Sequence, residues 1–367
     1  MLGIGSNVLT LGQYKTVPQM ENLIKNIEIN NFKSIKGLRL DCKQVNLFIG
    51  KPNVGKSNIL EALGLLSNPS YYTYHFGEGV LRFESLHNFF YDEDTNNTIE
   101  ITTNNQRVEI TLTPDDIFEF LILNKQINKD EKNINLTDYY ERDKPYVKFG
   151  IKAEGSIQER KDEIKKGIDS FCKKYTFKLS SSYSSKFPDF LIPPHGENLF
   201  VIVDRNQELK GRVAALSKEQ GLDFVLDRRN AKFEFQKRVD EYIYQYPYSS
   251  IADTFQRFIF YLAAIESNNH SVLIFEEPEV HSFPPYVREL AERMVLKDDN
   301  QYFISTHSPY LLQTFIDSLD ATQLNVYLTY YRNYQTQVKA LTPDELRDIQ
   351  DAGYDVFFNL SKFEPNE

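Results

Sequence analysis

The residues from Gly50 to Ser57 have the types and the spacing that hold the phosphates of a nucleotide. They read Gly-Lys-Pro-Asn-Val-Gly-Lys-Ser, which fits the pattern G-x-x-x-x-G-K-[ST]. Glycines let the backbone N–H groups of such a loop curl around phosphate oxygens, and the N-terminus of the following helix adds partial positive charge. Lys56 is expected to reach the β- and γ-phosphates, and the Ser57 hydroxyl to bind Mg²⁺. The candidate nucleotide-binding residues are Gly50, Asn53, Val54, Gly55, Lys56, Ser57 and Asn58.

The same loop also resembles that of translation-type GTPases, so the base needs a separate test. Such a GTPase would carry a D-x-x-G segment and an N-K-x-D segment whose carboxylate reads the guanine. No D-x-x-G follows Ser57 at a suitable distance, and the segments 124–127 and 128–131 both lack the final Asp. The sequence therefore favours ATP, with Mg²⁺ as its metal.

Three glutamates follow a run of apolar residues. The run covers 272–275, and Glu276, Glu277 and Glu279 come directly after it. A parallel strand that ends beside a phosphate loop can deliver one carboxylate to Mg²⁺ and the next to the attacking water. We therefore assign Glu276 to the metal shell and Glu277 to the water. A solvated acidic loop is the alternative, but carboxylates at the end of a buried strand need a cation or donors nearby.

A histidine follows a second apolar run. His307 comes after 302–305, at the end of the next expected strand. A lone histidine says little, because imidazole serves many roles, but the order of the three motifs gives this one weight. His307 is expected to hydrogen-bond the γ-phosphate and to be catalytic together with Glu277. The sequence thus predicts that three strand ends meet at one triphosphate.

Buried strands and helices must bring these residues together. Strands are expected at Val45–Ile49, 272–275 and 302–305, helices after Ser57 and at 250–266, and antiparallel strands over 78–115. These patterns divide the chain into five parts. They are a flexible tail at 1–20, an N-terminal ATPase lobe with the phosphate loop at 21–115, an inserted subdomain at 116–195, a C-terminal ATPase lobe at 196–320, and a C-terminal extension at 321–367.

The three motifs in this order resemble the ABC-type ATPases. The segments 276–281 (Glu-Glu-Pro-Glu-Val-His) and 305–309 (Ser-Thr-His-Ser-Pro) look most like the branch of RecF-type, SMC-type and OLD-type ATPases, and 31–35 and 57–63 are also similar. The resemblance implies an α/β fold with a mixed sheet, an antiparallel edge sheet and an inserted α/β subdomain. It also implies ATP-linked pairing of two copies into a homodimer or a higher oligomer.

In that branch a Ser-Gly segment of one subunit closes over the γ-phosphate bound to the other. The matching residues here are Ser249 and Ser250, which we expect to contact the partner's nucleotide. The usual glycine is missing, and Asp253 stands near its place. A plain helix start is the alternative, because Ser250 and Asp253 have the spacing of a capping box.

Composition and charge limit the class of protein. With 41% hydrophobic residues and a formal net charge of −10, the 367-residue chain can bury a large core and is not an evenly basic nucleic-acid coat. Its two cysteines exclude a cysteine-rich zinc site and fit a reducing compartment. The longest apolar run, 258–265, is far shorter than a membrane span. We expect a cytoplasmic protein without a membrane partner.

Two groups of basic residues leave DNA contact as an open alternative to solvated faces. The first is Lys161, Lys165, Lys166, Lys173 and Lys174, and the second is Arg228, Arg229, Lys232, Lys237 and Arg238.

The expected function is a dimeric ATPase switch. OLD-type proteins usually carry a nuclease domain after the ATPase, but the stretch after Pro309 is too short for one, so no nuclease activity is expected here. The family resemblance implies phage defence or DNA repair. We favour defence through a separately encoded effector, a nuclease or a toxin. A RecF-like repair ATPase and a transporter ATPase subunit are the alternatives.

Overall fold

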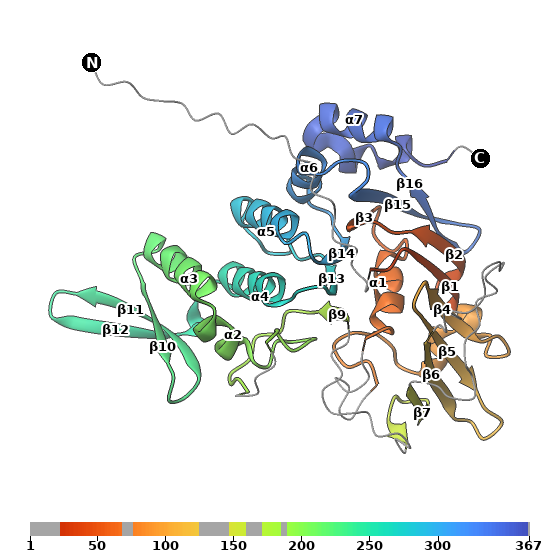
Figure 1. Ribbon diagram of the computed structural model, residues 1–367, viewed down its shortest axis with the longest axis horizontal. Helices are drawn as coiled ribbons and strands as arrows, with labels where there is room; N and C mark the ends of the chain where they lie inside the picture. The colour runs from red at the N-terminus through yellow and green to blue at the C-terminus, as the bar shows by residue number, and fades with distance from the viewer. Residues whose placement is uncertain (1–22, 68–75, 125–146, 159–170, 185–188, 366–367) are drawn as a thin grey trace, which may run out of the picture.

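The computed structural model describes residues 23–67, 76–124, 147–158, 171–184 and 189–365. The tail predicted at 1–20 lies outside these residues. Figure 1 shows two β-sheets that enclose a helix, further helices on the opposite side, and a third small sheet that extends from the body. No helix among the described residues is long and apolar enough to cross a membrane.

A six-stranded mixed sheet carries the motifs. Its order is β16-β15-β3-β14-β13-β9, and the five strands from β15 to β9 run parallel while β16 is antiparallel to β15. The central strands β3 and β14 are buried at every position and mostly apolar, as expected for strands covered on both faces. The bounds are β3 Val45–Ile49, β9 Cys172–Tyr175, β13 Val272–Glu276, β14 Gln301–Ser305, β15 Leu324–Arg332 and β16 Gln335–Ala340.

A seven-stranded antiparallel sheet forms the N-terminal part, in the order β2-β1-β4-β5-β6-β7-β8. Its strands alternate buried and partly exposed positions, so one face packs on the core. The bounds are β1 Asn26–Phe32, β2 Ile35–Asp41, β4 Ile99–Thr103, β5 Gln106–Leu112, β6 Phe118–Asn124, β7 Val147–Ile151 and β8 Ile157–Gln158.

Helices cover both faces of the mixed sheet. Alternate residues of β13 point to opposite faces, so Val272 and Ile274 join the apolar cluster around α1 and the antiparallel sheet, while Leu273 and Phe275 join the cluster under the other helices. The helix bounds are α1 Lys56–Gly64, α2 Leu199–Arg205, α3 Gln207–Glu219, α4 Asp253–Ser267, α5 Pro284–Leu296, α6 Pro309–Ser318 and α7 Pro343–Ala352.

A small α/β unit precedes α4. It consists of α2, α3 and a three-stranded antiparallel sheet of β10 (Asp223–Asp227), β11 (Lys232–Val239) and β12 (Tyr242–Pro247). Phe233 and Phe235 on β11 are buried and anchor this sheet to the main core. The outer half of the β11–β12 hairpin extends away from the body (Figure 1).

The α/β fold class with a mixed sheet and an antiparallel edge sheet is confirmed, but the predicted boundaries differ from the sheets that form. The described strands of the range 116–195 belong to the two main sheets, because β6 and β7 pair within the antiparallel sheet and β9 joins the mixed sheet. The α/β unit at 199–247 is what interrupts the ATPase part. Residues 321–367 are not a mere extension, because β15 lies directly beside β3. The predicted boundaries rest on charged segments and turn residues, which are local features of the sequence. The observed boundaries of the sheets depend instead on pairing between strands that are far apart in the chain.

The core of the mixed sheet gives a stability prediction. Phe275 is fully buried and packs against the rings of Tyr175, Tyr261 and Tyr302. Phe275→Ala is expected to lower the free energy of unfolding by about 3–5 kcal/mol, because it leaves a cavity. Urea denaturation measures the loss. Leu296→Ala, at a side chain that is 71% exposed, is the control and should change little; similar losses in both variants would contradict this view of the core.

Candidate active site

The loop between β3 and α1 has a shape that depends on its glycines. A Cβ at Gly50 would lie 2.2 Å from the Thr329 carbonyl oxygen, and one at Gly55 would lie 1.9 Å from Thr336 Oγ1. Gly55 also has a left-handed φ of 98° and serves as the N-cap of α1 without a side-chain cap. The first N–H groups of α1 are therefore left to an anion, which is the requirement for holding a phosphate.

Lys56 is buried at the start of α1. Its Nζ donates hydrogen bonds to the carbonyl oxygens of Gly50, at 3.0 Å, and Lys51, at 2.9 Å. Burial lowers the pKa of Lys56, while the carboxylates of Glu277, Glu276 and Glu279 act in the opposite direction. The cation thus stands over its own loop and faces the acidic strand end.

The loop, the acidic strand end and the histidine line one cleft of about 800 Å³. Asn53, Val54, Gly55 and Asn58 belong to its walls, together with residues that the motifs did not single out. The structure therefore brings together the three strand ends, while the role of each residue stays a prediction. The predicted residues Lys56, Ser57, Glu276, Glu277 and His307 all face this cleft, and Ser34, Arg82, Arg257, Tyr261 and Tyr331 also line it.

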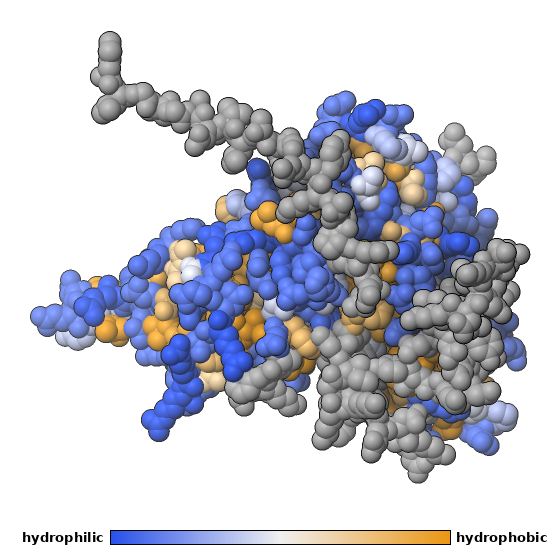
Figure 2. Space-filling model, in the orientation of Figure 1, coloured by the Kyte–Doolittle hydropathy of each residue, from blue (hydrophilic) through white to orange (hydrophobic). Residues whose placement is uncertain are grey.

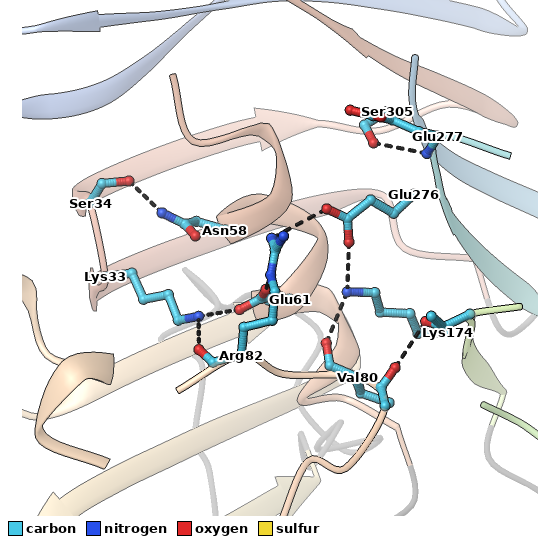
Figure 3. Close-up of polar contacts among 12 residues, drawn as sticks. Lys33, Ser34, Asn58, Glu61, Val80, Arg82, Lys174, Glu276, Glu277 and Ser305 are labelled. Carbon is cyan, nitrogen blue, oxygen red and sulfur yellow. Dashed lines mark hydrogen bonds and ion pairs between the residues drawn. The ribbon is translucent and has the colours of Figure 1, made fainter. Parts of the chain in front are cut away.

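Glu276 is held by two cations, Lys174 and Arg82, that belong to none of the three sequence motifs (Figure 3). Lys174 Nζ lies 3.3 Å from Glu276 Oε2, and Arg82 Nη2 lies 3.2 Å from Glu276 Oε1. Burial would raise the pKa of Glu276, but Lys174, the Ser57 hydroxyl and Arg82 together lower it. The carboxylate is therefore kept ionised at the end of β13.

The same network reaches the antiparallel sheet. Arg82 Nε also donates to Oε1 of the fully buried Glu61, at 2.7 Å, and Lys33 donates to the other Glu61 oxygen. Lys33 follows β1, Glu61 lies on α1, and Arg82 lies in the loop that follows α1. Figure 3 shows how these side chains converge below Glu276. A buried carboxylate shared by two cations joins the N-terminal sheet to the nucleotide loop.

Glu277 and His307 face each other across the cleft. Their nearest side-chain atoms, Glu277 Oε1 and His307 Nε2, are 3.5 Å apart. Glu277 has a left-handed φ of 44°, and its backbone N–H donates to the Ser305 carbonyl oxygen at 3.0 Å. Burial and the nearby Lys56 lower the pKa of His307, against the opposing effect of Glu277. The imidazole is therefore biased towards its neutral form.

Glu279, the last glutamate of the segment, has a positioning role that the sequence did not reveal. Its Oε1 accepts hydrogen bonds from Thr306 Oγ1 and from the His307 backbone N–H, both at 2.7 Å. The Thr306 backbone N–H in turn donates to the Phe48 carbonyl oxygen on β3, at 3.1 Å. Glu279 thus fixes the backbone that carries His307 between the acidic strand and the nucleotide strand.

Ser249 and Ser250 do not face this cleft. They lie in the one-turn helix η4 (Tyr248–Ser250), and both are exposed. The helix cap considered for Ser250 is not found, because α4 starts at Asp253 after Ala252 and has no side-chain cap. Asp253 instead accepts a hydrogen bond from Arg257, at 2.7 Å, and contacts His281 Nδ1 at 3.0 Å. The two serines are thus free to meet another molecule.

Other expectations change with the structure. Lys173 and Lys174, expected with the first basic group, are buried and cannot grip a nucleic-acid backbone, because they lie on β9 inside the sheet. Lys161, Lys165 and Lys166 lie outside the described residues.

The Asn58 side chain donates a hydrogen bond to Ser34 Oγ at 2.7 Å, so it connects the start of α1 to the turn that follows β1. No local pattern marks Arg82 or Lys174, since only tertiary contact places them at Glu276.

The oxygen donors at the site fit Mg²⁺. The Ser57 hydroxyl and the Glu276 carboxylate both line the cleft, and the hydroxyl helps to lower the pKa of Glu276, so two oxygen ligands suited to a hard cation stand at one site. Within the described ranges, no group of three or more His, Cys, Asp or Glu side chains could hold a metal ion by itself. Mg²⁺ usually takes few protein ligands and completes its shell with water and phosphate oxygens. The residues therefore suit a metal that arrives with a nucleotide.

Comparisons with known proteins agree with this geometry. The family model described as "AAA domain, putative AbiEii toxin, Type IV TA system" matches residues 45–313. The match covers more than half of the chain, from β3 into α6, and so includes the phosphate loop, Glu276, Glu277 and His307. A Helicobacter pylori protein named ATP/GTP phosphatase is 32% identical over 102 residues, which are 24% of this chain and 28% of that protein. The chain thus spans less than a third of this relative.

Solved structures of SMC heads are distantly similar. The SMC head domain from Thermotoga maritima has a TM-score of 0.40 at 11% identity and covers 87% of this chain and 99% of that chain. An SMC head bound to the C-winged helix domain of ScpA has a TM-score of 0.47 at 11% identity, with 89% and 99% covered. An SMC head with an extended coiled coil, bound to a ScpA domain derived from Pyrococcus furiosus, has a TM-score of 0.46 at 12% identity, with 90% and 98% covered.

The buried partner of Glu276 gives a prediction. Lys174→Met keeps the apolar stem but removes the cation, and is expected to lower the free energy of unfolding by about 2–4 kcal/mol, because the Glu276 carboxylate and the Val80 carbonyl lose a donor. Urea denaturation of this variant, of Glu276→Gln and of the double variant measures the coupling. Lys148→Met, which breaks a surface pair with Glu119, is the control and should cost less than about 1 kcal/mol. Additive losses at Lys174 and Glu276 would show that the pair is not coupled.

Proposed function

This chain belongs to the AAA-domain family whose model spans residues 45–313, and we propose on that premise that it is a Mg²⁺-dependent ATPase that works as a pair of identical subunits. The observation that carries the proposal is the shared cleft. Lys56, Glu277 and His307 come from three distant segments and face one volume of about 800 Å³. A phosphate loop with a carboxylate and an imidazole opposite it has the parts needed to hydrolyse a phosphoanhydride.

The residues divide the work of phosphoryl transfer among them. Lys56 turns from the carbonyls of its own loop to the β- and γ-phosphates, and the N–H groups of the loop and of α1 hold phosphate oxygens. Ser57 and Glu276 would hold Mg²⁺, which neutralises charge on the phosphates when it is bound. Catalysis then rests on position and charge rather than on covalent chemistry.

Glu277 and His307 act on the reacting end of the triphosphate. The Glu277 carboxylate orients the attacking water and accepts its proton, because it faces the cleft from the end of β13. The neutral His307 donates a hydrogen bond to the γ-phosphate and so distinguishes triphosphate from diphosphate. Glu279 keeps the His307 backbone at the right place for this contact.

A second copy completes each site through Ser249 and Ser250. Support comes from their exposure and from their absence from the cleft of their own chain. In a two-fold dimer the segment of one subunit would close over the γ-phosphate of the other, giving two composite sites. ATP binding would then favour the dimer and hydrolysis would release it, which makes a switch.

We assign the switch to cytoplasmic phage defence through a separately encoded effector, a nuclease or a toxin. The description of the family, which refers to a toxin of a type IV toxin–antitoxin system, supports this assignment. RecF-like repair has weaker support, since Lys173 and Lys174 of the first basic group are buried and cannot contact DNA. Co-purification from the native operon tests the assignment: a bound nuclease or toxin supports it, and bound DNA without an effector contradicts it.

The ATPase proposal is tested by Glu277→Gln. The amide cannot accept the proton of the attacking water, so hydrolysis should fall at least about 100-fold while ATP still binds. Phosphate release measures turnover, equilibrium titration measures ATP binding, and light scattering measures the dimer that ATP should now trap. Lys56→Ala is the control and should lose ATP binding itself. Rapid turnover by Glu277→Gln would refute the role of Glu277.

The positioning role of Glu279 gives a separate prediction. Glu279→Ala should lower kcat about tenfold or more with little change in KM, because it frees the His307 backbone. Glu279→Gln keeps an acceptor oxygen for Thr306 and His307 and should stay close to wild type. Because Glu279 acts through His307, the loss in Glu279→Ala/His307→Ala should not exceed that in His307→Ala. If kcat of the double variant fell by the product of the two single losses, Glu279 would act independently of His307.

A further inference from the structure

Strand β12 has a free edge that carries no charge. In the sheet β10-β11-β12 it pairs with β11 alone, so within the part of the chain that the structure describes its other edge has no strand partner. Its sequence is Tyr-Ile-Tyr-Gln-Tyr-Pro, and all six residues are exposed. Natural edge strands are normally protected by lysine, by proline or by a bulge. Only Pro247, at the end of β12, gives such protection here.

The hairpin that contains β12 gathers large hydrophobic side chains in the open. Figure 1 shows this arm extending from the body, and Figure 2 shows hydrophobic residues among hydrophilic ones along it. Tyr242, Tyr244 and Tyr246 point to one face of β12, with Val239 opposite Tyr242, whereas Ile243 points to the other face. A contiguous group such as the one on the tyrosine face marks an interaction site. The exposed side chains are Val239 at 41%, Tyr242 at 70%, Ile243 at 55%, Tyr244 at 51% and Tyr246 at 37%.

We propose that β12 pairs edge to edge with β12 of a second copy of this chain, in an interface separate from the nucleotide cleft. A free row of backbone N–H and C=O groups selects a strand as its occupant, because only a strand satisfies them in register. Two identical strands related by a two-fold axis meet antiparallel. Opposed residues of an antiparallel pair lie on the same face, so tyrosine would then stand opposite tyrosine and Ile243 opposite Ile243 or Gln245 of the second copy, and aromatic pairs of this kind are favourable.

The distribution of charge favours a second copy over an unrelated partner. The cations nearest to the edge, Lys237 and Arg238, lie on β11 opposite Tyr244 and Ile243. In the paired arrangement the two sets of cations are three strand spacings apart, about 14 Å. That exceeds the screening length of roughly 8–10 Å at physiological salt. The strand can therefore meet its own copy without like-charge repulsion.

The size of the contact predicts its strength. Six strand residues are far fewer than the roughly 20–30 residues a side of a standard interface. The β12 dimer should therefore be weak and concentration-dependent, with a dissociation constant on the order of micromolar. Pro247 leads directly into Tyr248–Ser250. The β12 contact would therefore also hold the exposed serines of each subunit near the other subunit and raise their local concentration there.

Sedimentation velocity on the full chain without nucleotide, in EDTA and up to about 100 μM protein, tests the proposal. Wild type and Lys56→Ala should both show a concentration-dependent dimer. Ile243→Lys should raise its dissociation constant at least about tenfold, because it adds a cation to each of two otherwise uncharged strand edges. Leu296→Lys, at an exposed aliphatic side chain on α5, is the matched control and should leave the dimer unchanged. Circular dichroism checks that each variant is folded.

Cysteine crosslinking locates the axis. Under mild oxidation, one of the variants Ile243→Cys, Tyr244→Cys and Gln245→Cys should give a disulfide-linked dimer. The wild type, which has its own Cys42 and Cys172, and the Leu296→Cys variant should not. A monomeric wild type at the highest concentration overturns the proposal. Equal effects of Ile243→Lys and Leu296→Lys on the dissociation constant of the dimer also overturn it. A third contrary result is a monomeric protein that binds an oligonucleotide and loses this binding in Tyr244→Ala. The ATPase proposal stands or falls separately, since none of these measurements uses nucleotide.

Discussion

Parallel pairing of β3, β14 and β13 is the constraint on which the site depends. In this register Phe48 stands beside Ser305, and Ser305 stands beside Glu276, so three chain segments end at one edge of the sheet. Parallel strands need long crossover connections, and here these are filled by helices that cover both faces. The chemical groups follow from this edge, because Glu276 ends β13, His307 comes two residues after β14, and the phosphate loop starts directly after β3.

Charge then determines how that edge is held. The carboxylates of Glu276 and Glu61 are shared among Lys174, Arg82 and Lys33, which come from the mixed sheet, the loop after α1 and the N-terminal hairpin. Such a network is expensive to break, since the loss of one partner leaves a desolvated charge behind. It connects the antiparallel sheet to α1 and to the end of β13.

The two surfaces that we propose for a second copy differ in character. The segment of Ser249 and Ser250 is polar and small, so a bound nucleotide would have to supply most of the attraction across it. The edge of β12 is uncharged and has no strand partner among the described residues, so the contact proposed there would not need a nucleotide. The two adjoin in the chain through Pro247 and Tyr248, which allows one contact to prepare the other.

The sequence by itself determined the local chemistry. The loop from Gly50 to Ser57, the carboxylates after 272–275 and His307 after 302–305 were all recognisable, because each depends on residue types within a few positions of one strand end. The strands themselves were recognisable for the same reason, as short apolar runs bounded by polar residues.

Only the tertiary structure decided which distant groups complete the site and where the sheets end. Lys174 has the look of a solvated lysine in its own segment, yet pairing of β9 with β13 buries it beside Glu276. Glu279 has the look of one more acid in a loop, yet it holds the His307 backbone. β15 lies far beyond the motifs in the chain and still packs beside β3. Burial and long-range strand pairing arise from the whole chain at once, so no local pattern of residues could have shown them.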